Sequence, residues 1–339
     1  MKKITKVLIS LLIVLMLTGC GKIKTYTSYT IYPIGYLLNR IGGNRIKAIS
    51  VQTDELVQVA KPKVKTEEEP GFKEIIDDSL FFFHIGDLEP YLEMYESDIA
   101  QSEVAVTDLS VLNAIYKFQR YTLVQANGRE TYIEAPYYDD SSFETIDIYD
   151  TDLFLWLDPI GMLSMAKKIY QTLASNYVEQ AVYFKENYTA LENDLIEVDA
   201  RYQNLSNKLK SESKVIKFVS MTPSFGCWQK SYGFQVYPVC LSKYGALPNE
   251  KQLEAIKQRI IQDDVKYIVY EPNMTTEMSE LFNSLADELG LIRVNLSNIS
   301  SLTQTQINDG KDYLSIMYEN LSVLENIAVQ VETKTELIN

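Results

Sequence analysis

Few side chains in this sequence are suited to catalysis or metal binding. His84 is the only histidine among 339 residues, and it lies near the end of the apolar run SLFFFHIG. Glu271 closes another apolar run, KYIVYE. Because ligands of α/β proteins bind at the carboxyl ends of parallel strands, both side chains are candidate contacts to a ligand. For His84 the alternatives are a ligand or pH-sensitive contact, and a satisfied, partly buried histidine beside the sheet.

The sequence has no residue pattern typical of an enzyme. Nucleophilic catalysis needs a nucleophile beside a base, and a single histidine with no such neighbour does not provide it. The glycines of YPIGYLLNRIGG do not have the spacing of a dinucleotide-binding loop. The three glutamates at 67–69 could bind calcium weakly, but a run of acids is more typical of a solvated surface. We therefore expect no catalytic residues.

The N-terminus has the pattern of an exported lipoprotein. Lys2, Lys3 and Lys6 precede the apolar segment VLISLLIVLMLT, which is too short to span a bilayer and suits a signal peptide. The segment ends in LTGC, a lipobox in which Cys20 would be acylated and become the mature N-terminus. We expect a chain held by this lipid on the extracytoplasmic face of the cell membrane; an ordinary signal peptide with a chance cysteine is the alternative.

Charge and the other two cysteines narrow the choices further. The formal net charge is −14, and removal of the signal peptide takes away three lysines and no acid. Nucleic-acid binding needs clustered Lys and Arg, so we expect no nucleic-acid partner. Cys227 and Cys240 form an even pair in an oxidising compartment, where a disulfide is one alternative. Two buried thiols are the other.

Apolar runs alternate with helical patterns, which predicts parallel sheets covered by helices. In the first half the apolar spacing predicts a helix over Ile31–Ile41, ended by two glycines, and strands at 45–52, 79–86 and 102–110. Residues 120–150 have no clear period, and part of them could form strands or a hairpin. The second half is more regular, with strands expected at 215–220, 234–242, 266–271 and 292–297, and helices at 249–262, 276–290 and 304–333.

One long amphipathic helix separates the two halves. From Phe184 to Leu209 the apolar residues follow in alternating steps of four and three. We interpret this helix as a rigid strut between two α/β lobes rather than a coiled-coil strand. The expected divisions are a signal peptide at 1–19, a tether at 20–28, an N-terminal lobe at 29–158, a helical linker at 159–210 and a C-terminal lobe at 211–335. The cleft between the lobes is the expected ligand site.

The order of these features resembles the cluster A-I solute-binding lipoproteins of ABC transporters, which capture zinc or manganese. The segments that carry the resemblance are YPIGYLLNRIGGNRIKAISV, EEEPGFKEIIDDSLFFFHIGDLEPYLE, TDLFLWLDPIGM, FVSMTPSFGCWQKSYGF and GKDYLSIMYENLSVL. The resemblance implies two α/β lobes and a rigid linking helix. Because a rigid strut between the lobes limits hinge bending, we expect small, loop-level change on ligand binding. The resemblance also implies an ABC permease and ATPase as partners, and a monomer.

The metal ligands of that family are not found at the matching positions. The resemblance places the family's His and carboxylate ligands at Thr66, Phe154 and Thr222, with the fourth at Ser297 or Asn298. Neutral oxygens are weak zinc ligands and a phenyl ring is none. We therefore assign no metal ligand and no cofactor, although the family implies zinc or manganese. Phe154 and Trp156 could line an apolar pocket or simply pack in the core, and Glu271 matches a family position with a structural role.

Two functions remain open. The first is a lipid-anchored solute-binding protein of a metal-type ABC importer, with a site that binds metal through other ligands such as His84, binds another small solute, or binds nothing. The second is a surface adhesion or interaction lipoprotein on the same scaffold. A cleft lined by convergent polar groups would favour the first function, and a collapsed apolar cleft with an exposed aromatic patch would favour the second.

Overall fold

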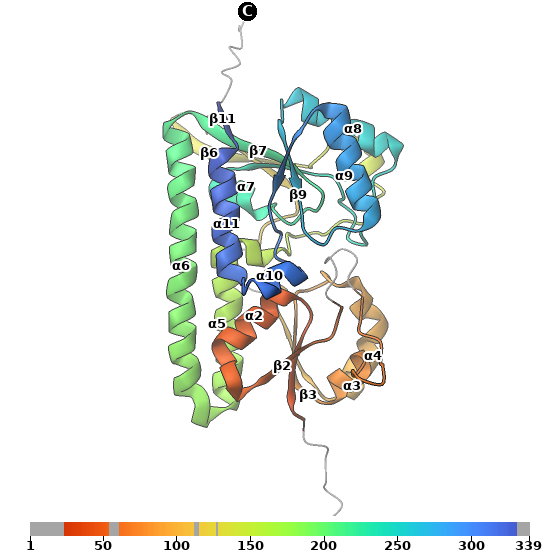
Figure 1. Cartoon of the computed structure of the whole chain (residues 1–339), viewed down its shortest axis with the longest axis vertical. Coiled ribbons are helices and arrows are strands. Elements are labelled where there is room, and N and C mark those ends of the chain that lie inside the picture. The colour runs from red at the N-terminus through yellow and green to blue at the C-terminus, as the bar shows by residue number, and fades with distance from the viewer. Residues whose placement is uncertain (1–23, 54–60, 112–114, 127, 331–339) are drawn as a thin grey trace, which may run out of the picture.

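The computed structural model describes residues 24–53, 61–111, 115–126 and 128–330, which form two α/β lobes beside a pair of long helices (Figure 1). This confirms the predicted fold class. Cys20, the expected signal peptide and the first four residues of the expected tether, 20–23, lie outside the described residues. The first strand begins at Tyr26, inside the range expected to be tether. Among the described residues, no helix has the length and apolar character that crossing a membrane requires.

The N-terminal lobe is built on four parallel strands in the order β2-β1-β3-β4. Its central strand β3 has the sequence SLFFFH and buries Phe81, Phe82 and Phe83 between helices on both faces. A strand covered on both faces is apolar along its length, which is why this run is recognisable in the sequence. The elements are β1 (Tyr26–Tyr29), α2 (Tyr32–Gly42), β2 (Lys47–Ser50), α3 (Phe72–Asp77), β3 (Ser79–His84), η3 (Pro90–Tyr95), α4 (Glu96–Gln101) and β4 (Ala105–Asp108).

The C-terminal lobe has a mixed sheet. Strands β10, β9, β7 and β8 are parallel, and the short β11 pairs antiparallel with the start of β7. Helices α8 and α9 lie together on one side of this sheet in Figure 1, and α11 lies on the side of α6. The elements are β7 (Lys214–Ser220), α7 (Cys227–Tyr232), β8 (Gln235–Pro238), α8 (Glu250–Gln262), β9 (Tyr267–Tyr270), α9 (Thr276–Leu289), β10 (Ile292–Asn295), α10 (Gln304–Asn308), α11 (Tyr313–Asn326) and β11 (Ala328–Gln330).

The prediction of one helix over residues 304–333 is wrong. The segment forms two helices, α10 and α11, and ends in strand β11. Gly310 adopts φ +66°, a conformation that interrupts a helix, and Asp312 then caps α11 by accepting a hydrogen bond from the Ser315 amide. The aspartate cap therefore starts a new helix after the break.

Residues 120–150 contain a β-hairpin, which was one of the possibilities considered from the sequence. Strand β5 (Arg120–Ala126) pairs antiparallel with β6 (Arg129–Ala135). Although these residues fall within the range expected for the N-terminal lobe, the segment contacts the C-terminal lobe. The Tyr132 hydroxyl donates to the carbonyl of Lys230, and the Tyr138 hydroxyl donates to the carbonyl of Pro238.

Helix α6 (Ala181–Ser211) joins the lobes, packed along α5 (Pro159–Asn176), and crosses both lobes in Figure 1. Toward the N-terminal lobe, Asp194 pairs with Arg40 of α2 at 2.6 Å. Toward the C-terminal lobe, the Tyr202 hydroxyl donates to the carbonyl of Met317 at 2.9 Å. Its buried stripe is the apolar series recognised in the sequence: Phe184, Tyr188, Leu191, Leu195, Val198, Tyr202, Leu205 and Leu209. The helix therefore fixes the two lobes to one frame.

Glu89 is an unusual buried carboxylate in the N-terminal lobe. It directly precedes η3 and is 1% exposed. Among the described residues, neither its carboxylate oxygens nor the hydroxyl of Thr30, a neighbour, has a well-aligned hydrogen-bond partner. Burial raises the pKa of Glu89 to about 8, partly opposed by Thr30 and nearby backbone groups. Glu89 is therefore protonated in the folded chain at pH values where an unfolded glutamate is ionised.

We expect Leu195→Ala to lower the free energy of unfolding by about 2–5 kcal/mol, because it removes a fully buried side chain and leaves a cavity in the stripe of α6. The matched control is Ile196→Ala on the same turn, where the side chain is 50% exposed and truncation should cost far less. Urea unfolding measures both. Equal losses in the two variants would show that this stripe does not hold the lobes to the helix.

We also expect stability to depend on the protonation of Glu89. A carboxyl whose folded-state pKa lies above its unfolded-state value stabilises the fold at low pH, and this contribution is lost as pH rises from about 4.5 to about 8. Glu89→Gln should reduce the downward slope of unfolding free energy over that range by up to about 1.4 kcal/mol per pH unit. Glu93→Gln, an exposed position in η3, is the control. Identical slopes for wild type and Glu89→Gln in urea titrations would contradict this assignment.

Candidate functional site

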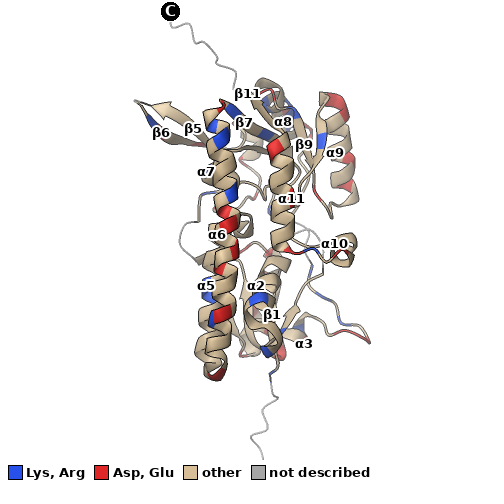
Figure 2. Ribbon diagram, turned by 60° about the vertical axis from the view of Figure 1, so that its left-hand side comes forward, with Lys and Arg blue, Asp and Glu red and all other residues tan. Residues whose placement is uncertain are grey.

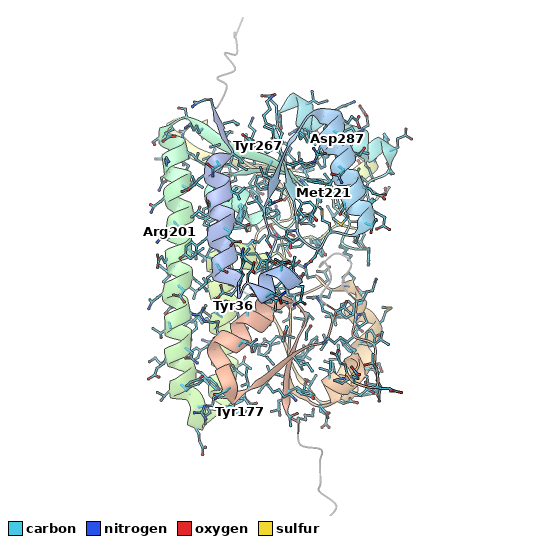
Figure 3. The ribbon with its side chains drawn as sticks, viewed as in Figure 1. Tyr36, Tyr177, Arg201, Met221, Tyr267 and Asp287 are labelled. Carbon is cyan, nitrogen blue, oxygen red and sulfur yellow. The ribbon has the colours of Figure 1, made fainter. Side chains whose placement is uncertain are left out.

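The junction of the two lobes gathers most of the positions singled out in the sequence. In Figure 3, Tyr267 at the start of β9 lies farther from the lower lobe than Met221, which follows β7. Because β7, β9 and β10 are parallel, their carboxyl ends all point toward the other lobe. Thr222, Glu271 and Ser297–Asn298 follow these three strand ends. The parallel pairing of the three strands therefore brings these residues to the same edge of the sheet.

Glu271 is the centre of this assembly. Its Oε1 accepts hydrogen bonds from the amides of Met221 and Thr222, at 2.8 and 2.9 Å. Its Oε2 accepts from the Thr222 hydroxyl at 2.6 Å and from the Asn298 side-chain amide at 2.9 Å. The side chain is completely buried. Four donors use the hydrogen-bonding capacity of a carboxylate, which has about four lone-pair sites.

The ionisation of Glu271 is finely balanced. Burial raises its pKa to about 7, while the hydrogen bonds from Thr222, Asn298 and Met221 lower it. Without those donors, a fully desolvated carboxyl would be more strongly biased to its neutral form. The hydrogen bonds therefore satisfy a buried acid and tie the ends of three strands to it.

Asn298 connects this assembly to the turn before the linker helices. Its side-chain oxygen accepts from the amide and hydroxyl of Ser300, and its backbone carbonyl accepts from the Trp156 indole at 2.7 Å. The Tyr313 hydroxyl in turn donates to the Trp156 carbonyl. Trp156, predicted as a cleft contact, is thus fully buried. Its indole hydrogen bond joins two residues that are 142 positions apart in the chain.

Ser297 is held by the last long helix. The Ser297 amide donates to the side chain of Asn320 at 2.9 Å, and the Asn320 amide donates back to the Ser297 carbonyl at 2.8 Å. The Ser297 hydroxyl accepts from the amide of Ile299, a non-glycine residue with φ +55°. The backbone and the side chain of Ser297 are therefore both engaged in hydrogen bonds that fix the loop after β10.

Phe154 is completely buried at the same junction. Its ring packs edge-on against Tyr149 and Trp156, with centroids 5.7 and 5.5 Å away. Such aromatic pairs add to the stability gained from burial alone. Phe154 therefore packs in the core and does not line an apolar pocket. The positions expected to line an open cleft are buried, because aromatic and hydrogen-bonded side chains fill the junction.

Asp152 was not recognised as important in the sequence. It lies two residues before Phe154, is 6% exposed, and accepts a hydrogen bond from the Phe154 amide. Burial raises its pKa to about 7. Gly226 packs closely against Asp152. A Cβ atom placed on Gly226 would lie 2.8 Å from the other carboxylate oxygen of Asp152 and 2.6 Å from the Tyr137 hydroxyl, too close for any residue but glycine. An acid two positions from a candidate ligand site was the signal that could have identified it.

Two predicted positions lie outside this assembly. Thr66 is on an exposed loop, and its hydroxyl accepts from the Glu69 amide at 3.0 Å. His84 is half-buried at the end of β3, stacked on Phe82, with Nδ1 3.2 Å from the Gly86 carbonyl. It lines a cavity of about 540 Å³ within the N-terminal lobe, together with residues of η3, α4 and β4. These contacts match the partly buried histidine beside the sheet.

The two cysteines are not joined. Cys227 and Cys240 are both buried thiols, so the disulfide alternative is not what the structure contains. Cys227 begins α7, whereas Cys240 follows β8 and packs in the same core. Burial raises the pKa of both thiols, to about 12 for Cys240, which makes them unreactive as thiolates. Each therefore behaves as a small core residue.

The assembly around Glu271 offers little to a metal ion. Thr222, Ser297 and Asn298 contribute neutral oxygens already engaged in hydrogen bonds, and Phe154 contributes no donor atom. No group of three or more His, Cys, Asp or Glu side chains that could hold a metal occurs in the described part of the chain. A metal bound by these side chains would have to displace hydrogen-bond donors from Glu271.

Comparison with known proteins gives the relationship of this chain to others. Residues 28–327 match the family model ZnuA, described as zinc-uptake complex component A, periplasmic. The zinc-binding protein AdcA of Streptococcus pyogenes is 24% identical over 319 residues, covering 90% of this chain and 56% of AdcA. The high-affinity zinc uptake system protein ZnuA of Bacillus subtilis is 22% identical over 175 residues, covering 52% and 53%. The chain thus spans about half the length of these curated relatives.

Solved structures agree on the fold. The laminin-binding protein Lmb of Streptococcus agalactiae has a TM-score of 0.67 at 17% identity, covering 89% of this chain and 99% of Lmb. The periplasmic zinc-binding protein TroA of Treponema pallidum has a TM-score of 0.65 at 15% identity, covering 90% and 99%. Identities this low carry the fold alone. The family match over nearly the whole described chain goes further, and the chain belongs to the ZnuA family of zinc-uptake components.

Proposed function

We propose that this chain is the extracytoplasmic solute-binding component of a metal-type ABC importer, anchored through lipid at Cys20, in which a structural hydrogen-bond network stands in place of the zinc shell. Family membership supports the transport role, and relatives are named zinc-binding lipoprotein AdcA and zinc uptake protein ZnuA. An ABC permease and ATPase are the partners such a component needs.

The observation that carries the proposal is the saturation of Glu271. Thr222 and Asn298, two positions where the family resemblance places ligands, both direct their side-chain donors at this one carboxylate. A metal that used Thr222 and Asn298 as ligands would have to take both side chains away from this carboxylate. Removing donors from a buried carboxylate is costly, because the freed groups lose their partners away from water.

Two forms of this role follow from a remodelled site. The chain captures a different small solute, or it serves the transporter as a companion that carries no cargo. In both forms the scaffold and the docking on a permease are retained, whereas the zinc or manganese chemistry is lost. The closed packing around Trp156 and Phe154 favours a junction whose role is structural.

The interaction hypothesis draws on relatives alone. Solved neighbours include Lmb, titled a bifunctional protein with adhesin and metal-transporting activity, and the laminin-binding protein Lbp of Streptococcus pyogenes. The filled junction meets one part of the criterion for the interaction role, but among the described residues Tyr244 and Tyr270 are the exposed large aromatic side chains, so the solute-binding role is the function we infer.

We expect the soluble chain, beginning after Cys20, to bind neither zinc nor manganese tightly. A ligand at about 1,000 times its dissociation constant stabilises a folded protein by about 4 kcal/mol, which produces a large thermal shift. Wild-type protein stripped of metal should show no such shift when titrated with either ion, and metal analysis should find less than one ion per chain. The Zn(II)-binding ZnuA-like domain of Streptococcus pneumoniae AdcA is the positive control.

A large shift with one bound ion per chain would overturn the proposal. Two variants then locate the replacement site. Loss of the shift in His84→Ala would place it in the N-terminal lobe beside β3, and loss in Glu271→Gln would place it at the junction. Equal melting temperatures of apo wild type and apo His84→Ala would show that the histidine acts on the metal rather than on folding.

A further inference from the structure

A second cavity lies at the end of the C-terminal lobe away from the junction. It has a volume of about 520 Å³ and opens between the β5–β6 hairpin, the last turns of α6, and strands β7 and β8. Its floor includes Lys214–Lys217, at the start of β7, whereas the Glu271 assembly lies beyond the end of that strand. The cavity is therefore separate from the site described above. Figure 2 shows Lys and Arg positions gathered where the hairpin, the end of α6 and β7 meet.

The charge of this cavity is opposite to that of the whole chain. Four cations line it, Arg120, Lys210, Lys214 and Lys217, but only two acids, Glu130 and Asp263. The chain as a whole carries a formal net charge of −14. A low-dielectric wall that holds an excess of one sign raises the local concentration of the opposite ion.

Arg120 is the cation without a sufficient partner. Its Nε is buried and has no hydrogen-bond partner among the described residues. Its guanidinium lies 3.6 Å from Asp263, too far for a hydrogen bond. The same Asp263 oxygen already accepts from Arg259 Nε and from the Tyr237 hydroxyl, each at 2.9 Å. Asp263 therefore offers Arg120 an ion pair but no hydrogen bond.

The ionisation of Arg120 reflects this poor pairing. Burial and the neighbouring Arg259 lower the pKa of its guanidinium from the usual value, and Asp263 only partly opposes them. An arginine offers five N–H donors in a planar fork that fits carboxylate and phosphate groups. Because Nε itself is buried, an anion in the cavity would pair with the terminal nitrogens of this fork, one of which lies 3.6 Å from Asp263.

The hairpin that covers the cavity is held firmly. The Lys230 ammonium lies among the rings of Tyr116, Tyr121 and Tyr132, at 5.7, 4.7 and 4.6 Å from their centroids. Cation–π contacts of this kind are attractive, and the Tyr132 hydroxyl adds a hydrogen bond to the Lys230 carbonyl. The wall that carries Arg120 is therefore preformed, which reduces the entropy lost when a ligand binds.

We propose that this cavity binds a small organic anion, with a carboxylate or phosphate group on Arg120 and an apolar body against the walls. The apolar lining includes the partly exposed Leu123 and the edge of Leu209, with Ile216 and Phe234 buried around them. Lys217, whose Nζ donates to the Asp263 carbonyl, adds positive charge at the floor, whereas Lys214 pairs with Glu212. A mostly apolar pocket with a few convergent charged groups is the usual form of a small-molecule site.

The test uses phenyl phosphate and inorganic phosphate as probes of the soluble chain. NMR follows the Arg120 Nε–H correlation, and calorimetry gives the affinity at low and high salt. We expect one saturable site per chain, a shift of the Arg120 signal, and tighter binding of phenyl phosphate than of phosphate. Arg120→Gln should weaken binding about tenfold or more, because a charge-assisted pair is lost. Arg129→Gln, on the exposed part of β6, makes the same charge change outside the cavity and should bind as wild type.

Other outcomes overturn the proposal. These are no saturable binding of either probe, or equal affinities of Arg120→Gln and Arg129→Gln. If Arg120→Gln fails to fold by circular dichroism, Lys214→Gln replaces it, since Lys214 pairs with Glu212 rather than with Asp263. Binding by Lys214→Gln as tight as wild type, with no shift of the Arg120 signal, then refutes the site. Zinc binding at the junction does not enter any of these measurements.

Discussion

The hydrogen bonds to Glu271 are the constraint on which the junction depends. One buried carboxylate joins the loop after β7 to the loop after β10, and it belongs itself to the end of β9. Asn298 extends this connection to the Trp156 indole and so to the turn that starts the linker helices. Removing Glu271 would leave each of these donors without a partner, so the hydrogen bonds of the assembly are expected to be cooperative. Of the positions singled out by the family resemblance, Phe154, Thr222 and Asn298 are buried parts of this packed junction, whereas Thr66 is exposed outside it.

Helix α6 restricts what the lobes can do. Arg40 and Asp194 fix it to α2, and Tyr202 and Ser206 fix it to the C-terminal lobe through buried hydrogen bonds. A hinge between lobes needs a segment that absorbs changes in backbone angles, and a continuous 31-residue helix along both lobes is not such a segment. Any motion that exposes Phe154 must therefore occur in loops, not through wide separation of the lobes.

The elements that follow one clear period were predictable, and those decided by distant partners were not. The alternating spacing of α6 and the apolar run of β3 are visible in the sequence because burial on one face or on two faces leaves a regular pattern. The β5–β6 hairpin has no such pattern, since its tyrosines are positioned by Lys230, about 100 residues later. The same holds for the site. The family resemblance placed Thr222 and Asn298 at one site, and the end of a strand made Glu271 a candidate contact, but neither indicated that Glu271 would take up their donors. Asp152 was missed because its close neighbours, Gly226 and Tyr137, are distant in the sequence or follow no clear period.

A preformed junction and a preformed cavity have different consequences for binding. At the junction every strong acceptor of Glu271 is used, so a ligand can enter only by breaking native hydrogen bonds. At the far end of the lobe, the Asp263 oxygen that already accepts from Arg259 and Tyr237 lies 3.6 Å from Arg120, whose buried Nε has no partner among the described residues. A ligand there gains charge-assisted hydrogen bonds without displacing any native partner of Nε. The balance of costs therefore favours recognition at the cationic cavity over recognition at the buried junction.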